Sequence, residues 1–169
     1  MLIRRLTKDD LEAVWALRLQ ALRESPESFG STYEDTLARG KGSILQRLQQ
    51  GGDDNFYFGA FDENLTLIGM IGFVREGGVK SRHKGDIVSL YTLPTARGHG
   101  IARALMQAVI DYAKQQGIEQ LHLAVVTTAR PARNLYRSLG FQTYGLAPRT
   151  LKLGERYWDE EFMLLELNN

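Results

Sequence analysis

Two glycines separated by a histidine precede a helix-forming stretch in the segment LPTARGHGIARAL, which runs from Leu93 to Leu105. Glycine lets the backbone make a tight turn, and the first amides of a helix have no partner within that helix. Their partial positive charge favours a phosphate group. Gly98 and Gly100 therefore predict a loop that could hold a phosphate-bearing ligand.

Two common phosphate-binding templates do not fit this loop. A P-loop requires a lysine followed by serine or threonine after its second glycine, but Ile101 and Ala102 follow Gly100. A dinucleotide fingerprint requires a third glycine where this chain has Arg103. The loop therefore requires another template, or it is a plain tight turn that binds nothing.

A second patterned segment, ARNLYRSLGF, runs from Ala132 to Phe141, and the first loop contains R-x-x-G-x-A, formed by Arg97, Gly100 and Ala102. In this order the two resemble the signatures of the GNAT (general-control-type N-acetyltransferase) superfamily, Q/R-x-x-G-x-G/A and A-x-x-L-Y-x-x-x-G-F. The resemblance implies an α/β fold with a mixed, mostly antiparallel sheet flanked by helices and with splayed central strands.

The resemblance also implies acetyl-CoA as co-substrate. In that family, backbone amides of the first motif grip the pyrophosphate of coenzyme A, and the preceding strand carries a β-bulge and contacts the pantetheine arm. The cofactor contacts implied for this chain are Leu90, Tyr91, Thr92, Leu93, Arg97, Gly98, His99, Gly100, Ile101, Ala102, Arg103 and Asn134. A solvated surface position is the alternative for each arginine. Asn134 does not have the spacing of the asparagine that relatives often carry, because Ala129 occupies that position.

Acetyl transfer to an amine requires a proton donor for the leaving sulfur and a base for the ammonium. Tyr136 matches the family tyrosine near the thioester, and a phenol with a pKa of about 10 can protonate a thiolate of similar basicity. Asp86 matches a position where some relatives carry a catalytic glutamate. The alternatives are a structural tyrosine and a turn aspartate. Other relatives carry a glutamate as the base in the following strand, but this chain has Ala124 at that position.

The remaining pattern supplies the elements that must position these residues. Helical spacing is seen first at Leu11, Val14, Trp15, Arg18 and Leu22. A second helical stretch runs from about Tyr33 to Gln50, and Gly40 and Gly42 weaken it and suggest a mobile or bent segment. Strand-like runs cover residues 2–6, 56–61, 67–74, 86–93, 118–126, 141–146 and 158–167, with helices over residues 100–117 and 130–139. We expect one domain over residues 1–169, built around a central β-α-β unit.

The amino-acid composition excludes some classes of function and disfavours others. The 169 residues include 21 basic and 20 acidic ones, so no charge excess favours nucleic acid or an anionic membrane. The chain has no cysteine, which excludes disulfides and a cysteine nucleophile, and its three histidines lack metal-ligand spacing, so no metal site is expected. Charges near the N-terminus disfavour a signal peptide, and no apolar run approaches membrane-spanning length. We expect a cytoplasmic protein.

The resemblance predicts an N-acetyltransferase that moves acetyl from acetyl-CoA to a primary amine, on a small molecule or a peptide or protein N-terminus, by direct attack in a ternary complex. The acceptor is expected between residues 23–36 and 147–161, which the family uses for this purpose. A non-catalytic acyl-CoA-binding regulatory module of the same fold is the alternative. A homodimer is also open, because dimers are common in the family.

Overall fold

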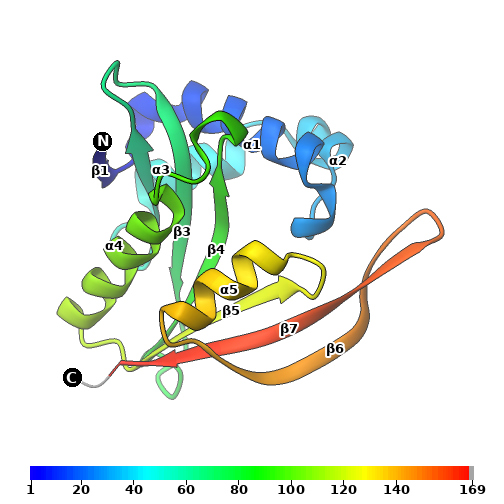
Figure 1. Ribbon diagram of the computed structural model, residues 1–169. Helices are drawn as coiled ribbons and strands as arrows, with labels where there is room; N and C mark the ends of the chain where they lie inside the picture. The colour runs from blue at the N-terminus through cyan, green and yellow to red at the C-terminus, as the bar shows by residue number, and fades with distance from the viewer. Residues whose placement is uncertain (168–169) are drawn as a thin grey trace.

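The computed structural model describes residues 1–167 and shows a central sheet with helices on both faces (Figure 1). The helices are α1 (Leu11–Glu24), α2 (Tyr33–Arg39), α3 (Gly42–Gln50), α4 (Ile101–Gln115) and α5 (Arg130–Ser138). The strands are β1 (Leu2–Arg5), β2 (Asn55–Phe61), β3 (Leu67–Arg75), β4 (Lys84–Thr92), β5 (Gln120–Val126), β6 (Gln142–Leu153) and β7 (Arg156–Glu166).

The seven strands form one sheet in the order β1-β2-β3-β4-β5-β7-β6. Every neighbouring pair is antiparallel except β4 and β5, which run parallel because α4 crosses between them. This confirms the mixed, mostly antiparallel α/β sheet that the sequence predicts. The parallel pair lies inside the sheet, between β3 and β7.

A capping box starts the first helix. The Asp10 carboxylate accepts from the backbone amide of Thr7 (2.8 Å) and pairs with both terminal nitrogens of Arg4 at 2.8 Å. These contacts fix the angle at which the chain leaves β1. The apolar face of α1 then buries Val14, Leu17, Ala21 and Leu22.

The helical stretch expected from Tyr33 to Gln50, with a weak point at Gly40 and Gly42, is divided into two helices in the structure. Gly40 has φ +72°, a left-handed conformation, and its amide donates to the carbonyls of Thr36 and Leu37 to close α2. Only glycine adopts this geometry without strain. The break turns the chain, so that α2 and α3 pack beside α1.

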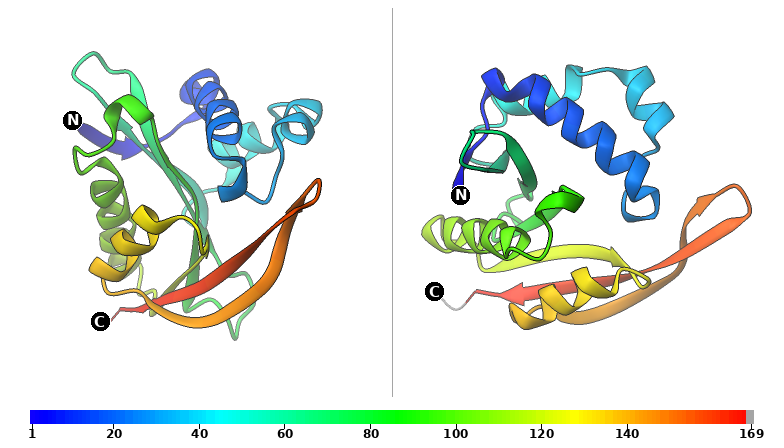
Figure 2. Two further views of the ribbon diagram at one scale, coloured as in Figure 1. Left: turned by 45° about the vertical axis from the view of Figure 1, so that its right-hand side comes forward. Right: turned by 45° about the horizontal axis from the view of Figure 1, so that its top comes forward.

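Two apolar clusters fill the two faces of the sheet. Figure 2 shows α4 and α5 on one face and α1, α2 and α3 on the other. The first cluster packs Leu105 and Val109 of α4 with Phe73 of β3, and the second packs Val14 of α1 with Met70 of β3. Each of these five side chains is at most 1% exposed. The sheet is thereby held from both sides, which fixes the ends of β4 and β5.

The C-terminal hairpin is longer than the runs at 141–146 and 158–167 predict. β6 and β7 cover residues 142–153 and 156–166 and turn at Gly154, which has φ +58°. The hairpin extends beyond the rest of the sheet towards the α1–α2 side (Figures 1 and 2). Its far end therefore lies across from the segment that joins α1 to α2.

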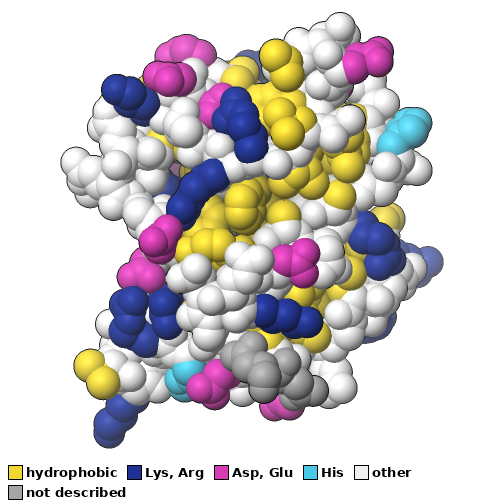
Figure 3. Space-filling view, turned by 90° about the vertical axis from the view of Figure 1, so that its left-hand side faces the viewer, with side chains coloured by type: hydrophobic (Ala, Val, Ile, Leu, Met, Phe, Trp, Pro, Cys, Tyr) yellow, Lys and Arg dark blue, Asp and Glu magenta, His cyan; other side chains and the backbone are white. Residues whose placement is uncertain are grey.

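The outer surface carries charges of both signs. The face in Figure 3 shows Lys and Arg side chains interspersed with Asp, Glu and apolar groups. Within residues 1–167, no helix combines the length and apolar character that crossing a bilayer requires. No group of three or more His, Cys, Asp or Glu side chains in that range is placed to hold a metal ion.

Candidate functional site

β4 and β5 separate after three residue pairs. Lys84, Gly85 and Asp86 pair with residues 120–122. Beyond them β4 continues to Thr92 and β5 to Val126, but the two strands no longer pair with each other. The two strands therefore splay, as the sequence predicts. An opening between the carboxyl ends of parallel strands is where ligands enter α/β sheets.

A β-bulge in β4 faces this opening. Val88 pairs with Gly72 and Tyr91 with Met70, so two residues of β4 stand opposite one residue of β3. Within the bulge, Ser89 has φ +56°, which is strained for a residue with a side chain. A bulge bends its strand and changes where the backbone groups point. Here it turns the chain at Ser89 beside the splay.

The splay contains a cavity of about 350 Å³, called here the central cavity. Its walls come from the bulge in β4, the end of β5, helix α5 and strand β7. Helix α1 and the loop that follows it complete the lining. Among the residues lining it are Arg18, Phe29, Ser89, Leu90, Ala124, Val126, Tyr136 and Glu160. The cavity thus brings a phenol and a carboxyl group to the bulged backbone.

Tyr136 enters the central cavity from α5 and is 8% exposed. Burial raises the pKa of its phenol to about 12, so the group keeps its proton at neutral pH. Helix α5 is fastened to β7 at Glu161, whose carboxylate accepts hydrogen bonds from Arg133 and from Arg137 (3.1 Å). This pairing sets the position of Tyr136.

The glycine loop lies at the start of α4. Gly98 and Gly100 have φ +80° and +77°, and Gly100 is the N-cap residue of the helix. A Cβ atom at either position would meet nothing within 4 Å, so open space lies against the backbone. The Ala104 amide donates to the Gly100 carbonyl (2.9 Å), and amides before it are not needed by the helix. The loop therefore presents free backbone amides to an open space at the start of α4.

The side chains around the loop are exposed, and some of them already form hydrogen bonds within the protein. The Arg97 Nε donates to the Thr92 carbonyl (3.2 Å), and the Arg103 guanidinium donates to the Ser138 hydroxyl (2.6 Å), which links α4 to α5. The His99 ring contacts the Arg97 carbonyl at 2.9 Å. Asn134 is exposed on α5. Three of these side chains thus support the loop itself.

The sequence comparison agrees with this geometry. The family described as "Acetyltransferase (GNAT) family" matches residues 15–141, which include the glycine loop, the bulge and Tyr136. The chain belongs to the GNAT family. It is also 29% identical over 141 residues to a mycothiol acetyltransferase of Brachybacterium faecium, covering 80% of this chain and 39% of that protein.

Other GNAT relatives match shorter stretches. An L-methionine sulfoximine/L-methionine sulfone acetyltransferase of Pseudomonas aeruginosa is 32% identical over 80 residues, which cover 47% of this chain and 46% of that one. The chain therefore spans less than half the length of these two relatives. In structure it resembles YncA from Salmonella typhimurium, solved with its cofactor acetyl-CoA, with a TM-score of 0.79, 21% identity and coverage of 100% and 95%. That likeness shows a GNAT fold.

Asp86 does not line the central cavity. It lies in an adjoining cavity of about 690 Å³ together with Glu76 and His122, and Val88 and Ala124 line both cavities. Burial raises the pKa of the Asp86 carboxyl, and the charge of Glu76 adds to the effect. Burial lowers the pKa of His122. The two catalytic candidates from the sequence, Tyr136 and Asp86, thus line different cavities of this GNAT domain.

The sequence reasoning missed Glu160, which shares the central cavity with Tyr136. Glu160 lies on β7 opposite Val126, the last residue of β5. Burial raises the pKa of its carboxyl. In the sequence, Glu160 is one of three consecutive acidic residues, DEE, within a strand-like segment, and nothing distinguishes it from its two neighbours. Only the register between β5 and β7 shows which of the three carboxylates reaches the cavity.

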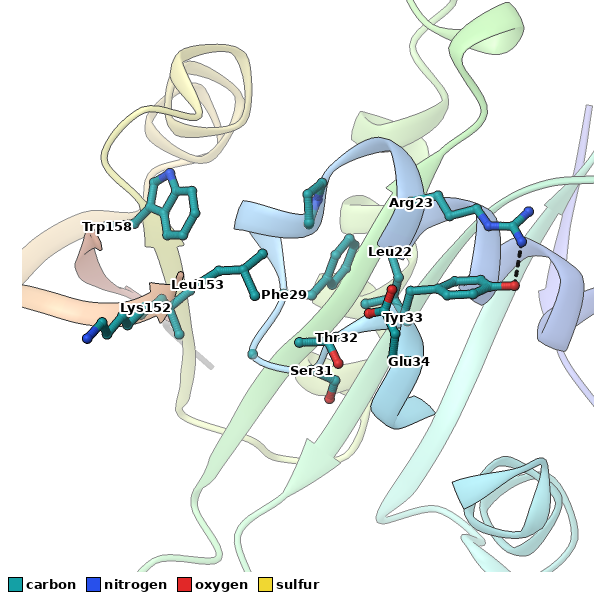
Figure 4. Close-up of a pocket in the computed structure, with 13 residues that line it drawn as sticks. Leu22, Arg23, Phe29, Ser31, Thr32, Tyr33, Glu34, Lys152, Leu153 and Trp158 are labelled. Atoms are coloured by element: carbon teal, nitrogen blue, oxygen red, sulfur yellow. Dashed lines mark hydrogen bonds between the residues drawn. The ribbon is translucent and has the colours of Figure 1, made fainter. Parts of the chain in front are cut away.

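The two segments expected to shape the acceptor site lie on one further cavity, of about 430 Å³ (Figure 4). We call it the hairpin cavity. Trp158 and Leu153 of the hairpin line one side, and Phe29 and Tyr33 of the α1–α2 segment line the other. Phe29 also lines the central cavity, so the two spaces adjoin.

The end of β4 is tied to its neighbours. The Tyr91 hydroxyl donates to the Glu24 carboxylate of α1, and burial together with this bond raises the pKa of that phenol. The Leu93 amide donates to the Ile68 carbonyl (2.9 Å), so it is already used within the sheet. Of the four residues expected to contact pantetheine, three at the end of β4 and Leu93 directly after it, Leu90 alone lines the central cavity.

Proposed function

We propose that this chain is an N-acetyltransferase that moves the acetyl group of acetyl-CoA to a primary amine within the central cavity. The observation that carries the proposal is the meeting of a bulged β4 backbone, a protonated phenol and a carboxyl group in one cavity between splayed strands. Family membership and the two motifs support it.

The glycine loop would hold the pyrophosphate of coenzyme A. The amides of residues 98–103 precede the hydrogen-bond ladder of α4, and their combined dipoles favour an anion there. Arg97 and Arg103 add positive charge at the rim. His99, Ile101 and Ala102 would contribute backbone contacts, and Asn134 would contribute an exposed contact from α5.

The backbone of β4 would hold the pantetheine arm along residues 90–93. The arm would lie in the splay as an extra strand, since β4 has no strand partner on that side beyond Asp86. Acetyl-CoA supplies an activated acyl carbon, at which a carbon–nitrogen bond forms while the carbon–sulfur bond breaks. A backbone amide at the bulge would donate to the acyl oxygen as negative charge develops on it.

The proton balance of the reaction requires a base and an acid. The amine, protonated in water, must lose a proton before it attacks and a second one afterwards, and the leaving sulfur must gain one. Tyr136, with its pKa raised to about 12, holds a proton that it can give to that sulfur. We assign the base role to Glu160, because it shares the cavity with Tyr136, and keep Asp86 as the alternative.

The charge balance of the chain and the absence of cysteine support further parts of this proposal. The lack of a cysteine that could carry the acetyl group supports direct attack in a ternary complex. We propose a cytoplasmic protein whose partners are acetyl-CoA and an amine, with neither nucleic acid nor a membrane. A homodimer is consistent with an exposed edge strand β6, on which Tyr144 is 56% and Leu146 59% exposed.

A non-catalytic acyl-CoA-binding module is the second candidate. One observation favours it: the exposed Ala124 lines the central cavity at the position where some relatives carry the base. The experiment that separates the two combines titration calorimetry of acetyl-CoA with an assay of coenzyme A thiol release, using a panel of amines and peptides. Binding with amine-dependent thiol release supports the enzyme, and binding without release from any amine supports the module.

A further inference from the structure

Besides the cavities described above, a further cavity adjoins the central one, and three arginines line it. It has a volume of about 250 Å³ and lies between α1, α2, α3 and the sheet. Arg18, Arg39 and Arg47 line it, together with several hydroxyl side chains and no acidic residue. We call it the arginine cavity. Such a lining is suited to an anion and disfavours an ammonium group.

Arg18 lines both the arginine cavity and the central cavity. Its guanidinium carbon lies 4.7 Å from the ring centroid of Phe29, which holds the side chain across the gap. The Nη1 atom is buried and has no hydrogen-bond partner. A buried donor without a partner is costly, so this atom points to a ligand that accepts from it.

The arginines of this cavity have no acidic partner in the described chain. None of the ion pairs formed by residues 1–167 includes Arg18, Arg39 or Arg47. Burial lowers the pKa of the Arg18 guanidinium; Tyr57 acts in the opposite direction, and the nearby charge of Arg47 lowers it further. Arginine still keeps its proton. Two positive charges held close together without a carboxylate would be stabilised by a bound anion.

Arg47 approaches the same space from α3. Its guanidinium carbon lies 4.5 Å from the ring centroid of Tyr57, which stacks it against the sheet. A Cβ atom on Gly72 would come within 3.2 Å of the Arg47 Nη1, so the glycine leaves room for this arginine over β3. Gly72 pairs with Val88, directly before the bulge. Arg47 therefore lies close to the bulged part of β4.

We propose that the acceptor is a free amino acid, whose carboxylate binds Arg18 and Arg47 while its amine lies in the central cavity near Glu160. The proposal rests on the proposed function and adds the substrate class to it. Ser89 lines both cavities, so the bulge is the point where the two ends of such a zwitterion would meet. A guanidinium can hold a carboxylate through two parallel hydrogen bonds.

Other amines fit this arrangement less well. A polyamine has no anionic group to neutralise the arginines, and the N-terminal residue of a peptide carries an amide in place of the carboxylate. An unpaired positive charge facing a neutral or cationic acceptor lowers affinity. The arginine cavity would therefore select amines that have a carboxylate within a few bonds of the nitrogen.

The test compares matched acceptors. The twenty standard L-amino acids are assayed for coenzyme A release, each beside its amide and its decarboxylated amine, such as L-leucine, L-leucinamide and 3-methylbutylamine. The same sets are run with Arg18→Met, Arg18→Lys and Arg47→Met. Arg82→Met removes a guanidinium that pairs with Asp54 and lines neither cavity, so it serves as the control. Circular dichroism confirms that each variant is folded.

We expect at least one amino acid to exceed its amide and amine in kcat/KM by about 10- to 100-fold, the range of a hydrogen bond to a charged group. Arg18→Met removes that preference, because it lowers kcat/KM for the amino acid far more than for the amine. Arg18→Lys restores the preference in part, and Arg47→Met weakens it. Arg82→Met keeps it. Equal rates for an amino acid and its amine, or equal losses for both in Arg18→Met, would overturn the proposal.

Titration calorimetry of the same amino acids and amines, in the presence of coenzyme A, gives a readout that does not depend on catalysis. Binding of an amino acid that weakens in Arg18→Met supports the arginine site even if no acetyl transfer occurs, in which case only the proposed function fails. Acetylation of amino acids and of carboxylate-free amines alike, with no effect of Arg18→Met on either, overturns the arginine site alone. Absence of amino-acid binding and of amino-acid acetylation also overturns it.

Discussion

Tyr136 of α5 and Glu160 of β7 line one cavity, opposite the bulge in β4. Burial raises the pKa of both groups, so the phenol keeps its proton at neutral pH and the carboxyl is a stronger base than an exposed glutamate. The pairing of an acid and a base across a splayed strand is the structural basis of the proposed acetyl transfer.

Tyr136→Phe removes the proton donor and leaves the shape of the cavity almost unchanged. We expect kcat to fall by about 10- to 1000-fold, because positioned acids contribute in that range. The dissociation constant of acetyl-CoA, measured by calorimetry, should change little. Full activity in this variant would remove Tyr136 from the mechanism.

Glu160→Gln tests the assignment of the base. We expect kcat to fall by about 100- to 10,000-fold and the acidic limb of its pH profile to disappear. In the wild type, that limb should lie above the ordinary glutamate pKa of 4.5, because burial raises this pKa and the base works only when deprotonated.

Two further variants complete the comparison of bases. Asp86→Asn should lower kcat by less than about 10-fold, since Asp86 lines the adjoining cavity. Glu155→Gln, at the exposed turn of the hairpin, should have no effect. If Asp86→Asn abolishes the acidic limb while Glu160→Gln retains it, the roles of the two carboxyls are reversed.

Glu161 should stabilise the fold by holding α5. Burial alone would raise the pKa of its carboxyl, but hydrogen bonds from Arg133 and Thr143 outweigh burial and hold it below its ordinary value. Glu161→Gln should lower the free energy of unfolding in urea by about 1.5–3 kcal/mol at neutral pH. Glu12→Gln breaks an exposed pair with Lys41 and should cost less than about 1 kcal/mol.

The contribution of Glu161 should also depend on pH. Its folded-state pKa is depressed, so its stabilisation is fully present above the ordinary value of 4.5 and is lost as pH falls through the folded-state pKa. Unfolding curves at decreasing pH should therefore converge for the wild type and Glu161→Gln. A gap that stays constant into strong acid would contradict the role of the charge.

Gly100→Ala tests the pyrophosphate loop. A side chain at φ +77° adds about 1–2 kcal/mol of strain although the space around it is empty. We expect acetyl-CoA to bind about 5- to 30-fold more weakly, because the loop must shift to relieve that strain. Gly42→Ala is the control, since this glycine has no positive φ and nothing within 4 Å. Unchanged affinity in Gly100→Ala would place the pyrophosphate elsewhere.

The sequence predicted what local patterns determine. The order of strands and helices and the glycine loop before α4 follow from periodicity and turn residues, and the splay followed from the family resemblance. Gly40 and Gly42 indicated a bent segment, but not that one helix ends there and another begins, because helical spacing continues on both sides of Gly40. The reach of the hairpin was also underestimated, since alternation fades where β6 lies exposed at the edge of the sheet.

The sequence alone could not identify residues whose roles depend on how distant segments pair and pack. Glu160 reaches the central cavity only because β7 pairs with β5 in one particular register. Arg18 shares the apolar face of α1 with Val14 and Leu22. A charged residue on an apolar face was the only sequence signal that Arg18 has a special role. Its lack of a partner becomes visible only when α3 and the sheet are packed beside it.

The most direct test of acetyl transfer in the central cavity uses acetyl-CoA labelled with ¹³C in its acetyl group. Wild type and Tyr136→Phe are incubated with the best acceptor, and mass spectrometry follows the label on the acceptor and on the intact protein. We predict label on the acceptor nitrogen, formed more slowly by Tyr136→Phe, and none on the protein as a turnover intermediate. An acceptor that stays unlabelled, or an acetylated protein that passes its label to the acceptor, would contradict the account.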